Sequence, residues 1–134
     1  VHFCLSEAKL GLLPAPIGPY VVRALGEQAS RRYFTTAERF SAVRAQQLGF
    51  VHEVVAADAL DTKVSEIVTA LVANGPAAVK ACKRLVQDIA GRPIDEALRA
   101  DTARRIADIR ASAEGKEGVQ SFLDKRSPSW SIEP

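Results

Sequence analysis

The sequence is poor in the residues that hold metals or form disulfides. Its 134 residues include two cysteines, two histidines, one tryptophan and no methionine. Cys4 and Cys82 lie far apart and among apolar neighbours, so we expect ordinary core thiols in a reducing compartment and no metal site. His2 and His52 are isolated as well, which argues against a histidine-based catalytic group.

Long apolar runs and clustered charges are also absent. No stretch approaches the roughly 18 apolar residues of a membrane span, and the net charge of +2 is distributed along the chain. A nucleic-acid-binding surface needs Lys and Arg gathered on one face, whereas the arginines at 31–32 and 104–105 are only pairs. We therefore expect a cytoplasmic protein whose partners include neither a membrane nor nucleic acid. Because 47% of the residues are hydrophobic, a folded domain is expected.

The pattern of apolar residues predicts a mainly α-helical chain with two short β-strands, at Phe3–Leu5 and Phe50–Val55. Short helices are expected at 20–25 and 27–34, and a third should begin at Ser41, a good N-cap, and run through Gln47. The strands are too short to form a sheet alone, so further strands should complete it.

From Ala59 onward, apolar residues recur at helical spacing in three further segments. Gly75 and Gly91 should end the first two, and Gly115 and Gly118 should interrupt the third. The chain therefore divides into residues 1–58 and a helical region, residues 59–134.

Glu7 is the best catalytic candidate. It lies in the segment FCLSEAKLGLLPAPIGP, residues 3–19, between an apolar strand signal and a turn rich in Gly and Pro, and it is the only acid in the first 26 residues. A carboxylate held among apolar groups can exchange a proton with a substrate. The alternative is an ordinary solvated or helix-capping acid.

This segment resembles the second catalytic-glutamate segment of the crotonase superfamily, the enoyl-CoA hydratases and isomerases. Glu7 and the turn residues Gly11 to Pro14 occupy the matching places, and SAVRAQQLGFVHEVV resembles the helix, glycine and strand unit that follows in the family. The resemblance implies the C-terminal portion of a crotonase-like (ClpP/crotonase) α/β fold. Residues 1–58 would end its core, and residues 59–134 would form the helical region that mediates trimer packing and shields CoA.

The resemblance implies an enoyl-CoA hydratase that adds water across the 2,3 double bond of an acyl-CoA. Glu7 would supply the proton to the α carbon, and no cofactor is needed because coenzyme A is part of the substrate. In the family, a second glutamate and the oxyanion hole come from earlier residues, so the 134-residue chain alone is expected to be an inactive fragment. The alternatives are an enoyl-CoA isomerase and a non-catalytic helical assembly module. The parent is expected to be a homotrimer or hexamer.

Two features bear on the substrate. After Pro14, Ala15 to Gly18 replace the Gly-Ala-Gly-Gly run of many hydratases. PAPIGPYVVRALGE and RRYFTTAERF resemble the methylglutaconyl-CoA hydratases, which act on branched or carboxylated enoyl-CoA in branched-chain amino acid catabolism. A generic enoyl-CoA hydratase of fatty acid catabolism remains the alternative.

The second family signature is FLDKR, residues 122–126. In the family its lysine contacts a phosphate of CoA, which makes Lys125 a CoA-binding candidate, and two adjacent cations suit a phosphate. The alternative is that these cations complement the helix dipole. Phe122 and Ile106 are further candidates for substrate contact, although packing is an alternative role for both.

Overall fold

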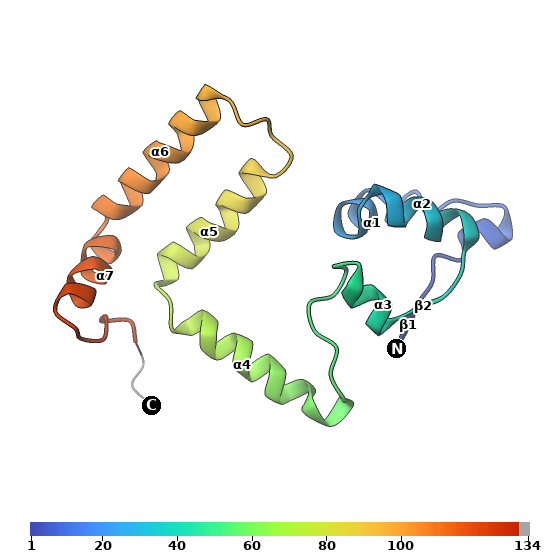
Figure 1. The fold of residues 1–134 in the computed structure, drawn as a ribbon, viewed down its shortest axis with the longest axis horizontal. Helices are drawn as coiled ribbons and strands as arrows, with labels where there is room; N and C mark the ends of the chain where they lie inside the picture. Colours follow the sequence, from blue (N-terminus) through green and yellow to red (C-terminus); the bar gives the residue numbers. More distant parts are fainter. Residues whose placement is uncertain (132–134) are drawn as a thin grey trace. The chain divides into compact units, whose positions relative to one another are not determined.

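The computed structural model describes residues 1–131, which form two compact units (Figure 1). The first is Val1–Ala59 and the second begins at Leu60. Helices dominate both units, and the described residues contain a single two-stranded sheet. The predicted class, mainly α with two short strands, is confirmed. No helix among residues 1–131 is both long enough and apolar enough to cross a membrane.

The sheet of the first unit pairs the N-terminal strand with a segment that was not predicted to be a strand. β1 (His2–Phe3) runs antiparallel to β2 (Phe40–Ser41), with Phe3 opposite Phe40. The predicted strand Phe50–Val55 is wrong, because this segment pairs with no strand. Its first residue instead donates its backbone N–H to Ala45 O (2.9 Å), and the side chains of Phe50 and Val51 pack on the core of the unit.

Short helices make up most of the rest of the first unit. They are the 3₁₀ helices η1 (Glu7–Leu10) and η2 (Ala57–Ala59) and the α-helices α1 (Gly18–Leu25), α2 (Glu27–Thr36) and α3 (Ala42–Gln47). Ser41 caps α3 as predicted, since its Oγ accepts the N–H of Arg44 (3.2 Å). The core consists of Leu5, Leu25, Tyr33, Phe40 and Ala45. The Phe40 ring lies between Phe3 and Tyr33, at centroid distances of 5.5 and 4.3 Å, so aromatic packing joins the strands to α2.

The second unit contains α4 (Leu60–Val72), α5 (Pro76–Ile89), α6 (Glu96–Ala111) and α7 (Ala113–Leu123). Each boundary has a local cause. Pro76 occupies the first turn of α5, where a missing N–H costs nothing. Asp95 caps α6 by accepting the N–H of Leu98 (2.8 Å), and Ser112 caps α7 by accepting the N–H of Gly115 (3.0 Å).

The predicted interruption at Gly115 and Gly118 is wrong. The chain bends at Ser112, and both glycines lie inside α7. They are needed for close contacts: a Cβ on Gly115 would lie 2.2 Å from Ile109 O, and one on Gly118 would lie 3.0 Å from the Trp130 ring. Glycine at these positions permits a tight α6–α7 corner and the approach of Trp130. These two glycines therefore do not end a helix, although glycine often does.

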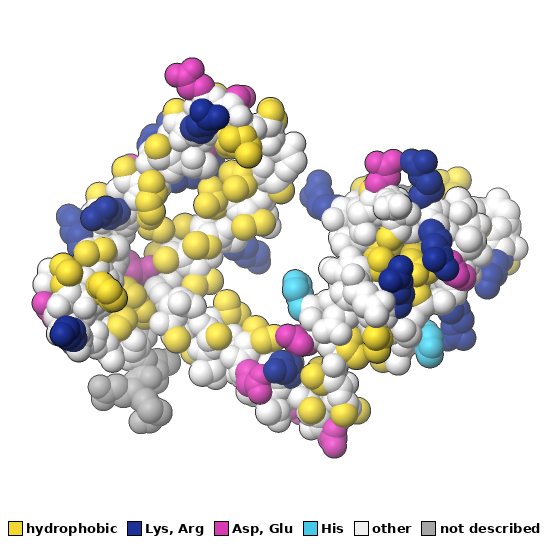
Figure 2. Space-filling view, viewed as in Figure 1, with side chains coloured by type: hydrophobic (Ala, Val, Ile, Leu, Met, Phe, Trp, Pro, Cys, Tyr) yellow, Lys and Arg dark blue, Asp and Glu magenta, His cyan; other side chains and the backbone are white. Residues whose placement is uncertain are grey.

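The helices of the second unit leave their apolar faces largely uncovered. Neither α4 nor α5 has a buried residue, and Leu98 is the buried residue of α6. The α4 stripe at Leu60, Val64, Ile67, Val68 and Leu71 is exposed, and Figure 2 shows hydrophobic side chains on the visible surface of these helices. Cys4 and Cys82 are also exposed, so their prediction as core thiols is wrong. Helical periodicity predicted these apolar faces correctly, but most of their large side chains stay exposed in the described residues.

A carboxylate from α7 caps the start of α5. Glu114 accepts the backbone N–H groups of Ala77 (3.0 Å, at Oε2) and Ala78 (2.8 Å, at Oε1). Gly75, the buried N-cap residue, makes room for this side chain, because a Cβ there would lie 2.5 Å from Glu114 Oε1. The glycine and the glutamate, 39 residues apart, therefore depend on each other.

This dependence predicts non-additive effects on stability. Glu114→Ala should lower the free energy of unfolding by about 1 kcal/mol, the usual cost of a lost helix cap. Gly75→Ala should destabilise the wild type by displacing the carboxylate, yet cost little in the Glu114→Ala background. Urea unfolding followed by circular dichroism measures the free energy of unfolding of the wild type, the two single variants and the double variant, with Glu114→Gln as the isosteric control. Additive effects would show that the two residues act separately.

Candidate functional site

Glu7 is the first residue of η1 and is half-buried. Its Oε2 is fully buried and has no hydrogen-bond partner within the described part of the chain. Buried carboxylate oxygens are normally paired, and an unpaired one is costly. The Glu7 carboxyl group therefore keeps one hydrogen-bonding position that the described residues leave unsatisfied.

The turn after Glu7 holds its backbone in place. Gly11 adopts a left-handed conformation (φ 72°), which glycine adopts without strain. Leu12 donates its N–H to Glu7 O (3.0 Å), Gly18 donates to Pro14 O (2.8 Å), and Pro14 is buried. The glycine and the proline noted in the sequence thus close the segment that carries Glu7.

Exposed apolar side chains follow Glu7 along the chain. They are Leu10, Leu12, Leu13, Ile17 and Tyr20. Solvent-exposed apolar groups in this number commonly mark a binding surface. A carboxylate with such neighbours suits a ligand that carries an apolar chain beside its reactive carbon.

Lys125 follows α7 in a conformation that is unusual for a side-chain-bearing residue. Its φ is 53°, in the left-handed region. Lys125 donates its N–H to Phe122 O (3.2 Å) and Arg126 donates to Ser121 O (3.0 Å), the hydrogen bonds of a Schellman cap. Glycine normally occupies this place, and another residue costs about 1–2 kcal/mol. The Lys125 and Phe122 side chains are exposed, and Lys125 forms no ion pair with any residue in the range 1–131.

Arg126, by contrast, forms ion pairs with two carboxylates. Its two terminal nitrogens bind both carboxylate oxygens of Glu117 (2.6 and 2.9 Å), and its Nε lies 3.5 Å from Asp124 Oδ2. Glu117 also accepts the N–H of Ser129 (2.9 Å). We call the contacts of Arg126 and Ser129 with Glu117 the C-terminal clamp. Of the two adjacent cations noted in the sequence, Arg126 is paired with carboxylates, whereas Lys125 has no ion pair among the described residues.

The C-terminal clamp changes the acidity of its members. The hydrogen bonds from Arg126 and then from Ser129 lower the pKa of Glu117 to about 2, and Glu117 raises the pKa of Arg126. Sequence reasoning did not single out Glu117. Its separation of nine residues from Arg126 spans the helix end and matches no helical spacing.

The C-terminal clamp should titrate at low pH. Because the folded-state pKa of Glu117 lies below the ordinary value of 4.5, the clamp's contribution to stability is complete above about pH 4.5 and is lost as the pH falls through about 2. Trp130 is the only tryptophan and contacts Gly118, so its fluorescence should report this loss. Glu117→Gln should abolish the fluorescence change below pH 4.5, while far-UV circular dichroism controls for general acid unfolding. An unchanged transition in Glu117→Gln would contradict the assignment.

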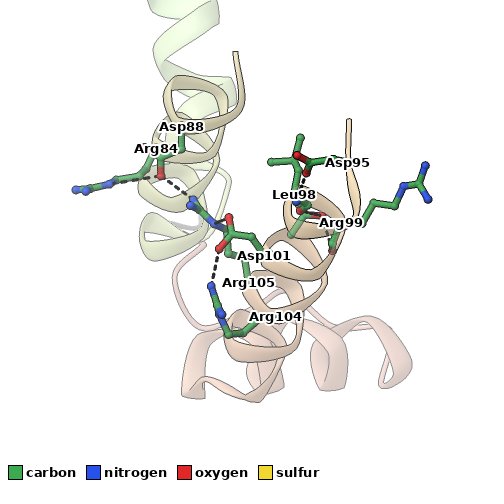
Figure 3. A network of polar contacts seen from close by, with 9 residues as sticks. Arg84, Asp88, Asp95, Leu98, Arg99, Asp101, Arg104 and Arg105 are labelled. Carbon is green, nitrogen blue, oxygen red and sulfur yellow. Dashed lines mark hydrogen bonds and ion pairs between the residues drawn. The ribbon is translucent and has the colours of Figure 1, made fainter. Parts of the chain in front are cut away.

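Ile106 lies on α6, where it lines an apolar groove between α5 and α6. The groove has a volume of about 650 Å³, and Ala81, Leu85 and Ile109 also line it. Arg105 at its edge joins the two helices by binding Asp88 of α5 (2.7 Å) and Asp101 of α6 (2.8 Å), as Figure 3 shows. The Arg105 guanidinium lowers the pKa of Asp88. The Arg105–Asp88 ion pair thus links α6, which carries Ile106, to α5.

The candidate residues fall in both units. Glu7 belongs to the first unit, whereas Ile106, Phe122 and Lys125 belong to the second. Phe122 and Lys125 lie together at the end of α7. Within residues 1–131, no group of three His, Cys, Asp or Glu side chains could hold a metal ion.

Comparison with known proteins defines the class. The family model described as enoyl-CoA hydratase/isomerase matches residues 1–133. The chain therefore belongs to the enoyl-CoA hydratase/isomerase family, and its fold is that of the crotonases. The resemblance noted in the Glu7 and FLDKR segments is confirmed at the level of the family.

Individual relatives agree with this assignment. An enoyl-CoA hydratase of Mycobacterium tuberculosis, EchA19, is 32% identical over 129 residues, covering 96% of this chain and 48% of the relative. A carnitinyl-CoA dehydratase of Citrobacter koseri is 30% identical over 96% of this chain and 51% of its own length. The crystal structure of an enoyl-CoA hydratase from Shewanella pealeana is 45% identical with a TM-score of 0.89, covering 97% of this chain and 48% of that one. The chain thus spans about half the length of the relatives it matches.

Proposed function

We propose that the whole enzyme containing these residues is an enoyl-CoA hydratase. In this reaction the oxygen of water bonds to C3 of the acyl group, and a proton is added to C2, the α carbon. Glu7 supplies that proton. The buried Oε2 of Glu7, which has no hydrogen-bond partner within residues 1–131, carries the proposal, because a bound water or substrate would supply the partner that a buried polar atom needs.

The surroundings of Glu7 fit this role. Its backbone is held by the Gly11 turn, so the carboxyl group starts from a defined position. The exposed apolar side chains that follow it suit an acyl chain. Coenzyme A enters as part of the substrate, and the proposal requires no separate cofactor.

An isomerase remains the rival reading. There a single glutamate at this position would move a proton between two carbons and no water would be added. The names of the relatives favour the hydratase, because hydratases and a carnitinyl-CoA dehydratase both add or remove water next to a CoA thioester.

The acyl substrate is proposed only as a class. The stretches 14–27 and 31–40 favour a branched or carboxylated enoyl-CoA such as methylglutaconyl-CoA, with a generic enoyl-CoA as the alternative. Ile106 would border the acyl end, and its exposed position in the α5–α6 groove leaves it accessible.

Glu7→Gln tests the catalytic role. The amide keeps the shape of the side chain but has no transferable proton, so kcat for enoyl-CoA hydration in the whole enzyme should fall by at least about 10²-fold. KM should change little, because the proton transfer acts in the transition state. Steady-state assays measure both constants.

Glu27→Gln serves as the matched control, since Glu27 is an exposed glutamate at the start of α2. Its activity should equal that of the wild type. Near-normal turnover in a folded Glu7→Gln enzyme would remove Glu7 from the mechanism.

We further propose that Lys125 binds a phosphate of CoA, with Phe122 beside it. The ammonium group, which forms no ion pair with residues 1–131, supports this role, and so does the left-handed backbone, since strained residues are often retained at functional sites. The left-handed backbone of Lys125 also makes two substitutions informative. Lys125→Gly removes the charge and relieves the backbone, whereas Lys125→Ala removes the charge and retains the strain.

Both variants should raise KM for CoA thioesters several-fold, consistent with about 1 kcal/mol for an exposed ionic contact. Neither should affect pantetheine thioesters, which lack the nucleotide phosphates, and salt should reduce the difference. Lys125→Gly should be at least as stable to urea as Lys125→Ala. If both thioester classes respond alike, Lys125 serves the helix end only.

The oligomeric state and the location of the whole enzyme stay predictions, and so does the inactivity of the isolated chain. The exposed apolar faces of α4 to α7 support a homotrimer or hexamer, because such faces need a covering surface. We also retain the expectations of a cytoplasmic enzyme and of an inactive 134-residue chain when it is tested alone.

A further inference from the structure

Lys125 is held in the chain between two fixed points. On its N-terminal side, the Schellman cap joins Lys125 and Arg126 to Phe122 and Ser121 of α7. On its C-terminal side, the C-terminal clamp binds Arg126 and Ser129 to Glu117. The short segment that carries the lysine is thus folded back along α7.

A second contact holds the same segment. The Trp130 ring lies so close to Gly118 that a Cβ there would be 3.0 Å from it. Ser131 donates its N–H to Pro128 O (3.0 Å), closing a turn around Trp130. Residues 126–131 therefore return to the helix turn that carries Glu117 and Gly118.

The two adjacent cations have different surroundings. Arg126 is neutralised by Glu117 and lies near Asp124, whereas Lys125 forms no ion pair with the described residues. Arginine suits a bidentate carboxylate contact, and lysine suits a mobile point charge. Arg126 therefore anchors the segment and leaves Lys125 to bind an external anion.

We propose that Glu117 and Arg126 are positioning residues for Lys125, which hold its backbone so that its ammonium group meets a phosphate of the CoA thioester. This inference rests on the proposed function of Lys125. Without the C-terminal clamp, residues 124–130 would sample more conformations, and ordering them again on binding would weaken the contact. The effect should appear in KM for substrates with nucleotide phosphates and not in kcat.

The test is a double-mutant cycle in the whole enzyme, read as the ratio of KM for a CoA thioester to KM for the matching pantetheine thioester. Glu117→Ala should raise this ratio about two- to fivefold with kcat unchanged. In the Lys125→Gly background the same substitution should change the ratio no further. Arg126→Lys, which keeps the charge but loses the bidentate geometry, should give a smaller increase.

Two controls make the outcomes distinct. Glu27→Ala breaks an exposed ion pair on α2 and should leave the ratio unchanged. Turnover of the pantetheine thioester shows that each variant is folded. If Glu117→Ala does not turn over this substrate, the KM ratio of Arg126→Lys tests the positioning role in its place. If Lys125→Gly raises the ratio while Glu117→Ala and Arg126→Lys do not, only the positioning role is overturned. If Lys125→Gly has no effect either, the proposed role of Lys125 fails, and the positioning role fails with it.

Discussion

The carboxylate of Glu114 at the start of α5 is the contact on which the arrangement of the second unit depends. It joins α7 to α5 through two backbone N–H groups, and it fits because Gly75 has no side chain. Arg105 adds an ionic link between α5 and α6. Because few apolar residues of this unit are buried, these polar contacts at helix ends and edges orient its helices. The apolar faces consequently remain free for other surfaces.

Glu7 and Lys125, the two proposed functional residues, are each held in place by contacts with nearby residues. Glu7 depends on the Gly11 turn within the first unit, and Lys125 depends on the cap and the C-terminal clamp at the end of α7. Local fixation suits a substrate such as an acyl-CoA, whose thioester and phosphates are far apart and need separate contacts. Each group is thus positioned by contacts within its own unit.

Much of the fold and of the candidate site could be predicted from the sequence, because local signals decide them. The apolar stripes of α4 to α6 follow from helical periodicity, and Ser41 caps α3 through a contact three residues away. Glu7 was chosen as a candidate from its isolation among apolar residues and from the glycine that follows it. The glycine adopts the left-handed conformation that such a turn requires. These features depend on neighbours in the chain, so the sequence by itself determined them.

Contacts between distant residues were decided by the tertiary structure alone. Phe50–Val55 has the composition of a strand but has no pairing partner, and its first two residues pack on the core instead. Gly115 and Gly118 look like helix breakers, yet they lie inside α7 because Ile109 and Trp130 occupy the space of their missing side chains. Arg126 looks like a free cation until Glu117 is found beside it. In each case the deciding neighbour lies outside any helical or strand period, and only folding brings it into contact.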